Sequence, residues 1–304
     1  MSTALPLLTG NELLVTLFAV ITLLGDAWFL LVGLSLAYWF GPHIDDTTRP
    51  VAVTVIGFAT LALAAVLALK SYTAMPRPAA LPIDPAGLPG VLAGFVAGEL
   101  DSSGFTFPSG HATGATAVYG GLGLLLTVGR RRWRYLVAGS LCVLVSFSRV
   151  MLQVHYLRDI LAGMALGALL IALGTRLGRG TSSVEGDDPS FRPGRVFGLA
   201  GVVAAGGLLV AIDAGHAEEV RHAAIGIGTA AGGGLTWQQV GEQLPGAPAV
   251  SVPVAVGGLV VAGGVWIGAY EGVFGLVGAA IGGAVGVAVI IALPLVEQWR
   301  KKRS

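Results

Sequence analysis

The stretch VAVTVIGFATLALAAVLALK, residues 51–70, decides the fold class of this chain. Residues 51–69 carry no charged side chain, and a helix rising about 1.5 Å per residue over this length crosses most of a bilayer core of roughly 30 Å. Comparable apolar runs recur along the chain, which is 54% hydrophobic and 12% charged, with a mean hydropathy of +0.80. No soluble globular domain needs so much apolar surface. The composition therefore predicts an integral membrane protein that spans the bilayer with helices.

The apolar runs fall into two groups separated by a polar segment that contains glycine and proline. The first group predicts a six-helix unit, with spans expected at 8–24, 26–41, 51–69, 110–128, 133–151 and 157–176. The second predicts about four more spans, at 197–215, 220–238, 249–269 and 272–294, of which 220–238 is the weakest. We therefore expect an all-α membrane helix bundle in three parts, namely a core at 1–177, a cytoplasmic linker at 178–195, and C-terminal helices of unknown role at 196–304.

Arginine and lysine clusters predict the orientation of the chain in the membrane, because basic residues flank spans on the cytoplasmic side. The clusters are Arg130, Arg131, Arg132 and Arg134, then Arg176, Arg179, Arg192 and Arg195, then Arg300, Lys301, Lys302 and Arg303. They predict a multi-pass protein of the cell membrane with a cytoplasmic C-terminus, and they do not indicate a nucleic-acid partner. The first 24 residues lack lysine and arginine, so we expect the N-terminus to be retained. By parity, the loop 71–107, the joint near 149–159 and the joint at Gly25 lie on the extracytoplasmic face.

A histidine and an aspartate share the last of these joints. His155 and Asp159 are four residues apart, so their side chains share one face if a helix begins there. An aspartate that accepts from one ring nitrogen leaves the other unprotonated, which suits His155 as a nucleophile. Taken alone, the pair is more typical of a helix start with an acidic residue in its first turn.

Three cations flank apolar spans on the same expected face, where basic residues are otherwise disfavoured. They are Lys70, Arg77 and Arg149. Guanidinium forks and an ammonium suit a phosphoryl group whose oxygens carry transition-state charge. The alternative for any one of them is an anchor whose side chain extends to the membrane interface.

The sequence FPSGHA, residues 107–112, precedes an apolar run. Ser109 and Gly110 sit where a helix N-terminus would point donors at an anion, so we expect both to bind phosphate. His111 beside them is a candidate general acid and base. The alternative is a serine helix cap with a neighbouring interfacial histidine. Asp26 opens a span on the same face and could tune His111 or Lys70, or simply begin a helix.

These three fragments resemble the type 2 phosphatidic acid phosphatases, which share an active-site plan with vanadium haloperoxidases. The family pattern is lysine, six residues, Arg-Pro; then Pro-Ser-Gly-His; then Ser-Arg, five residues, histidine, three residues, aspartate. The matching residues are Lys70, Arg77, Pro78, Pro108, Ser109, Gly110, His111, Ser148, Arg149, His155 and Asp159. The resemblance covers about residues 50–176 and implies a phosphatase without metal or cofactor. It implies a phosphohistidine at His155, with His111 as acid and base, on a six-helix core.

The leading hypothesis is a membrane phosphatase for a lipid phosphate or pyrophosphate of the phosphatidate, phosphatidylglycerophosphate or polyprenyl pyrophosphate type. The apolar stretch 88–100 within the expected outer loop could shape entry for the lipid chain. Three alternatives remain open at this level. They are a phosphatase for a soluble sugar phosphate similar to glucose-6-phosphatase, a lipid phosphotransferase, and a non-catalytic binder or transporter of anionic lipid.

Overall fold

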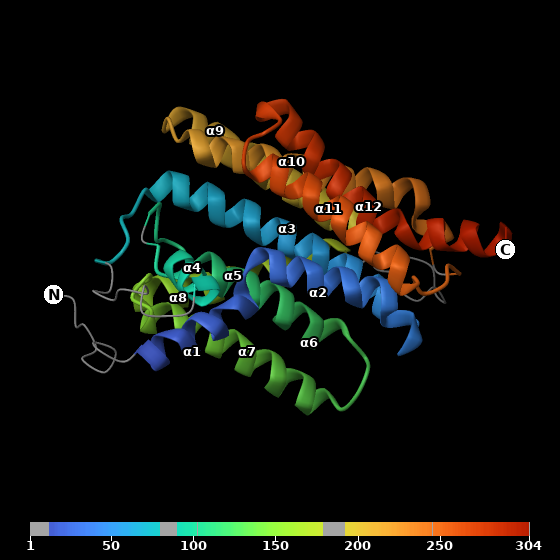
Figure 1. The fold of residues 1–304 in the computed structure, drawn as a ribbon, viewed down its shortest axis with the longest axis horizontal. Helices are drawn as coiled ribbons and strands as arrows, with labels where there is room; N and C mark the ends of the chain where they lie inside the picture. Colours follow the sequence, from blue (N-terminus) through green and yellow to red (C-terminus); the bar gives the residue numbers. More distant parts are fainter. Residues whose placement is uncertain (1–11, 80–89, 102, 179–191, 245, 304) are drawn as a thin grey trace.

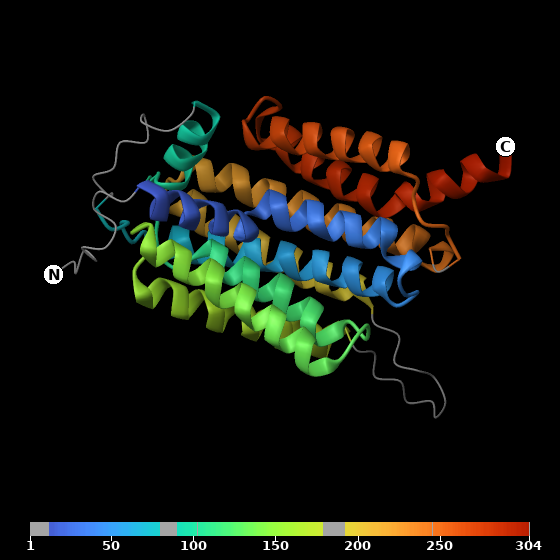
Figure 2. The same cartoon turned by 60° about the horizontal axis from the view of Figure 1, so that its bottom comes forward.

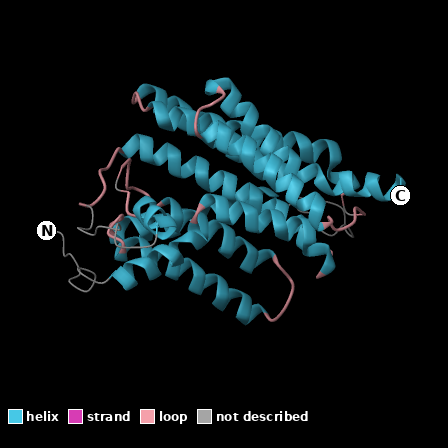
Figure 3. Ribbon diagram, viewed as in Figure 1, coloured by secondary structure: helices cyan, strands magenta, loops and turns pink. Residues whose placement is uncertain are grey.

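The computed structural model describes residues 12–79, 90–101, 103–178, 192–244 and 246–303 (Figure 1). These residues form helices and loops, with no strand and one isolated bridge between Pro76 and Phe105 (Figure 3). Among them, six helices are long and apolar enough to cross a membrane. They are α3 (Thr48–Thr73), α7 (Arg131–Met151), α8 (Leu157–Gly178), α9 (Pro193–Asp213), α11 (Val252–Tyr270) and α12 (Gly275–Arg303). The predicted all-α, polytopic membrane bundle is confirmed.

The N-terminal part of the bundle differs from the expected pair of spans. Helix α1 (Glu12–Thr22) and helix α2 (Ala27–Phe40) have 11 and 14 residues, which at about 1.5 Å per residue is too short for either to cross alone. With the 3-10 turn Leu23–Gly25 between them, they form a pair bent by 50° that is long and apolar enough to cross a membrane only when both helices are taken together. The bend is at Gly25, where an added Cβ would lie 2.4 Å from Val145 and 3.0 Å from His111. The joint at Gly25 therefore lies beside His111, on the expected face. Helix α1 does not run back from this joint to the opposite end of the bundle, as a separate span would.

Helix α1 instead extends toward the end of α7 that carries Arg149. Val15 and Ala19 of α1 are buried in a small cluster with Met151, Leu152 and Val154. Phe18 meets Phe147 edge to face, with ring centroids 5.9 Å apart. The described start of α1 is consequently at the same end of the bundle as residues 149–159, whereas two separate spans would have placed it at the opposite end.

The helix that follows the FPSGHA segment runs without a gap from 110 to 125. It consists of α5 (Gly110–Ala115), a π-helical segment (Thr116–Gly120) and α6 (Gly121–Leu125). It corresponds to the expected span 110–128. It packs against α7 and α8, and Gly163 and Gly167 of α8 allow a close approach.

The C-terminal helices pack directly on the N-terminal part. Figure 2 shows α2 and α3 between a layer formed by the helices of residues 110–178 and a layer formed by α11 and α12. Helix α9 lies along α3, and Gly207 of α9 meets Ala68 of α3. Helix α10 (Ala217–Val240), at the weakest predicted span, packs on α9 and α12 but is not among the six apolar helices.

Of the expected linker at 178–195, the structure describes only the two ends, residues 178 and 192–195. Most of the expected linker lies outside the described residues, but the backbone N–H of Arg192 donates to the carbonyl of Gly178 over 2.9 Å. Arg49 of α3 ties the C-terminal part to the core at the end far from Arg149. Its guanidinium donates to the carbonyls of Tyr38, Leu244, Ala247 and Pro248. Because α3 packs against both parts, one cluster of buried residues includes side chains of both.

Candidate active site

The three sequence fragments meet at one end of the bundle. Lys70 lies in the last turn of α3, His111 in the first turn of α5, and Arg149 in the last turn of α7. His155 precedes α8, and Asp159 lies in its first turn. This is the end at which α4 and α8 are labelled in Figure 1, opposite the C-terminus.

Backbone hydrogen bonds join the fragments to one another. The N–H of Thr106 donates to the carbonyl of Met75 over 2.9 Å, which links the loop after α3 to the segment before α5. The N–H of Ser109 donates to the carbonyl of Asp159 over 3.1 Å, which links that segment to α8. The positions of the three fragments are therefore coupled without reference to any bound ligand.

The nucleophile predicted from the sequence is buried. His155 is 3% exposed and Asp159 is fully buried. Burial lowers the pKa of His155 to about 3, an effect that the Asp159 carboxylate opposes and that the cations Arg149, Lys70 and Arg77 reinforce. The imidazole is therefore neutral at neutral pH, and a neutral ring nitrogen has the lone pair that a nucleophile needs.

The side chains of His155 and Asp159 lie close together although His155 precedes α8 and therefore shares no helix face with Asp159, and a third residue lies between them. The distance from His155 Nδ1 to Asp159 Oδ2 is 3.6 Å, longer than a hydrogen bond. The hydroxyl of Thr106 lies 3.0 Å from Nδ1 and donates to Asp159 Oδ2 over 2.5 Å. Sequence spacing did not single out Thr106, because it is 49 residues from His155; its position three residues before Ser109 was the available signal.

His111 has a carboxylate partner from the bent N-terminal span. Its Nε2 lies 2.7 Å from Oδ1 of Asp26, and the histidine side chain is 22% exposed. Asp26 directly precedes α2, as the helix-start interpretation expected, and its carboxylate also contacts His111. Ser109 caps α5 by accepting a hydrogen bond from the N–H of Ala112 over 3.4 Å. The capping role is observed, and phosphate binding by Ser109 and Gly110 stays a prediction.

The three predicted phosphate-binding cations differ in their surroundings. Nη1 of Arg149 donates to Glu99 Oε2 over 2.6 Å and to the hydroxyl of Thr22 over 3.1 Å, so this guanidinium already has an anionic partner. Nη1 of Arg77 donates to the carbonyl of Asp101 over 3.4 Å, and its buried Nε has no partner among the described residues. The charge on Lys70 is repelled by both arginines, which places all three cations in one region.

Glu99 is the second residue that the sequence did not single out. It ends helix α4 (Gly90–Glu99), which lies in the apolar stretch 88–100. Burial raises the pKa of Glu99, and the charge of Arg149 opposes that rise. The signal in the sequence was an acidic residue at the end of an otherwise apolar run on the same expected face.

Asp26, Glu99 and His111 are the described residues whose ligand atoms are close enough to hold a metal ion, within 4.8 Å of one another. The guanidinium of Arg149 is bonded to one of them, which opposes the addition of a second cation at the same carboxylate. Independence from metal remains a prediction.

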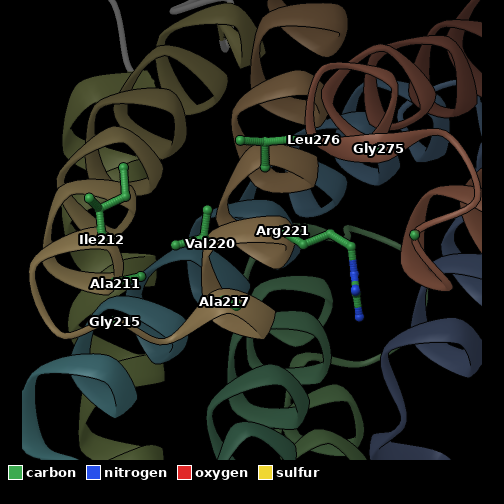
Figure 4. A pocket seen from close by; sticks show the side chains of 9 residues that line it. Ala211, Ile212, Gly215, Ala217, Val220, Arg221, Gly275 and Leu276 are labelled. Carbon is green, nitrogen blue, oxygen red and sulfur yellow. The ribbon is translucent and has the colours of Figure 1, made fainter.

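A cavity of about 490 Å³ lies between α9, α10, the turn before α12 and the start of α12 (Figure 4). It is lined by Ala211, Ile212, Gly215, Ala217, Val220, Arg221, Gly272, Gly275 and Leu276. None of these belongs to the three motifs. The turn between α9 and α10 nevertheless reaches the site, because the rings of His216 and Phe105 have centroids 4.7 Å apart.

Comparison with known proteins agrees with these motifs. Residues 51–181 match the family model described as the PAP2 superfamily. Phosphatidylglycerophosphatase B of Bacillus subtilis (strain 168) is 40% identical over 77 residues, which are 23% of this chain and 38% of the relative. The match thus spans well under two thirds of that relative, and no solved structure matches the chain. Residues 51–181 of this chain belong to the PAP2 superfamily.

Proposed function

We propose that this protein is a membrane phosphatase that hydrolyses a lipid phosphate or pyrophosphate through a phosphohistidine on His155. The observation that carries the proposal is the convergence of a buried neutral histidine, a second histidine with its own carboxylate, and three cations at one end of the bundle. Family membership and the relative named as a phosphatidylglycerophosphatase support the same reaction class.

In the first step, the lone pair on a ring nitrogen of His155 attacks phosphorus, and the P–N bond forms as the P–O bond to the lipid breaks. His111, whose Nε2 is held by Asp26, protonates the departing oxygen. Lys70, Arg77 and Arg149 offset the charge on the phosphoryl oxygens. In the second step, His111 takes a proton from water, the hydroxide attacks phosphorus, and the P–N bond breaks to release phosphate and neutral His155.

The proposed substrate is a lipid because the site lies at one end of the membrane-spanning helices, the depth at which lipid head groups lie. The basic residues of the first turn of α7, the last turn of α8 and the last turn of α12 are far along their helices from the site end. With basic clusters on the cytoplasmic side, the active site faces the extracytoplasmic side and the C-terminus is cytoplasmic.

The test is phosphate release by the purified protein in detergent micelles, with EDTA present. Phosphatidylglycerophosphate, phosphatidate, a polyprenyl pyrophosphate and glucose 6-phosphate would be supplied separately. We expect release from at least one lipid, its loss in His155→Ala, and its retention in His43→Ala, an exposed histidine outside the site. Release from the sugar phosphate alone, or from none of the four, would refute the lipid assignment, and loss on chelation would refute the metal-free mechanism.

A further inference from the structure

We infer that Thr106 is a positioning residue that couples Asp159 to His155 and selects the ring tautomer that can attack phosphorus. The inference rests on the proposed function of His155 as nucleophile. Thr106 is fully buried, and its hydroxyl is within hydrogen-bond distance of both partners, at 3.0 Å from Nδ1 and 2.5 Å from Oδ2. The direct distance from His155 Nδ1 to Asp159 Oδ2 is 3.6 Å, longer than a hydrogen bond, so the hydroxyl is the group that joins the two side chains by hydrogen bonds.

Donor and acceptor arithmetic then fixes the proton on the ring. An ionised carboxylate only accepts hydrogen bonds, and Oδ2 of Asp159 also accepts from the backbone N–H of Tyr156 over 2.8 Å. The single hydroxyl hydrogen of Thr106 must therefore point to Oδ2. Its remaining lone pairs can only accept, so Nδ1 of His155 must carry a hydrogen and donate it. Nε2 is then the unprotonated nitrogen.

The opposite tautomer leaves one bond unmade. With the hydrogen on Nε2, the ring nitrogen Nδ1 becomes an acceptor and competes with Asp159 for the one hydroxyl hydrogen. Either a buried carboxylate oxygen or a buried ring nitrogen then faces an oxygen lone pair and is left unsatisfied. The penalty for one unsatisfied buried group corresponds to a roughly 5- to 150-fold excess of the reactive tautomer.

The threonine is held in place from both sides. Its N–H donates to the carbonyl of Met75, and the adjacent Phe105 bridges to Pro76. Its β-branched side chain has few rotamers, so a fixed backbone also fixes the direction of the hydroxyl. The loop after α3 thereby sets the orientation of a histidine that precedes α8.

The same arrangement serves the first chemical step. As the Nε2–P bond forms and the P–O bond breaks, positive charge develops on the ring and the Nδ1–H becomes a stronger donor. The Thr106 oxygen accepts from it more strongly while its own hydrogen stays on Asp159, so no proton leaves the ring. The carboxylate charge thus stabilises the imidazolium through one hydroxyl.

The experiment compares Thr106→Val, which removes the hydroxyl and keeps the shape, with Thr106→Ser, which keeps the hydroxyl. Thr60→Val is the matched control, since Thr60 is also buried and its hydroxyl donates to the carbonyl of Ile56 within α3. We expect kcat for the lipid phosphate to fall about 100-fold in Thr106→Val, within the range that general acid–base and orienting groups contribute. KM should change less than about threefold, while Thr106→Ser and Thr60→Val stay within about fivefold of the unsubstituted protein.

Nitrogen NMR of protein labelled with 15N-histidine gives a readout that does not depend on turnover or on the stability of a variant. We expect the His155 signal, assigned by its loss in His155→Gln, to show Nδ1 protonated and Nε2 unprotonated. An Nε2–H tautomer in the unsubstituted protein, or full activity in Thr106→Val, would overturn the inference. Failure of the unsubstituted protein to hydrolyse any lipid phosphate would instead refute the proposed function, and the tautomer would remain measurable.

Discussion

Replacing Gly163 by alanine tests whether the close contact between α5 and α8 sets the geometry of the site. An added Cβ would lie 2.7 Å from the carbonyl oxygen of Ser109, 3.0 Å from the hydroxyl of Thr113 and 3.1 Å from Cβ of Ala112. The nearest of these atoms is backbone, so the clash cannot be relieved by a rotamer change. The N-terminus of α5, which carries His111, must move away from α8.

The size of the effect follows from that distance. Ordinary van der Waals contact begins at about 3.4 Å, so α5 and α8 must separate by several tenths of an ångström up to about 0.7 Å. A displacement of about 1 Å in a catalytic group costs on the order of 100-fold in rate. We therefore expect kcat/KM to fall roughly 10- to 100-fold, together with a loss of about 1–3 kcal/mol in the free energy of unfolding from overpacking.

The assay is phosphate release from the preferred lipid in detergent, with thermal unfolding measured on the same samples. Gly139→Ala is the matched control, because Gly139 is exposed on α7 and an added Cβ there has no atom within 4 Å. We expect the control to match the unsubstituted protein in both measurements. If Gly163→Ala retained full kcat/KM, the two histidines would not depend on this contact, and the coupling of α5 to α8 would be wrong.

Three further predictions concern other parts of the molecule. Glu99→Gln should remove the carboxylate that is paired with Arg149, so that the guanidinium can bind phosphate instead. We expect the inhibition constant of inorganic phosphate to fall about tenfold. An inhibition constant equal to that of the exposed control Glu218→Gln would contradict this. Arg49→Met should lower the free energy of unfolding by about 3 kcal/mol through the loss of hydrogen bonds to four carbonyls, with kcat nearly unchanged; an unaltered melting temperature would count against it. Because burial lowers the pKa of His155 to about 3, the unfolded chain binds more protons than the folded one between about pH 6.5 and 3. The contribution of the neutral ring to the free energy of unfolding is therefore complete above that window and falls on acidification by about 1.4 kcal/mol per pH unit. His155→Gln should remove this dependence when the free energy of unfolding is measured from pH 7 to 4.5. The same pH dependence in the variant and the unsubstituted protein would contradict the prediction.

The sequence was most informative where polar residues interrupt apolar runs. Three polar fragments could be assigned to one face, namely Lys70, the FPSGHA segment and residues 148–159. The reason is that a charged side chain at the end of a span is costly unless it binds a partner of opposite charge. The motif spacing was specific enough to identify the family, which the match over residues 51–181 bears out. The C-terminal helices were located but not explained, and their packing along α3 shows that they share its core.

The chain order could not reveal contacts made across the bundle. Hydropathy counts residues in a run and cannot detect a bend, so the sequence predicts two spans where the structure has two short helices bent by 50° beside the closely packed Gly25. The pairing of Glu99 with Arg149 joins residues 50 positions apart, and that of His111 with Asp26 joins residues 85 positions apart. Neither pair has a helical or strand period that would predict it.

Composition and short fixed spacings were enough to predict the membrane-spanning class, the family and a set of candidate site residues. The contacts between polar groups became visible with the folded bundle: Asp26 faces His111, Glu99 faces Arg149, and Thr106 lies between His155 and Asp159. Hydrogen bonds act over about 3 Å, and the packing of helices, rather than their order along the chain, brings distant segments within that distance.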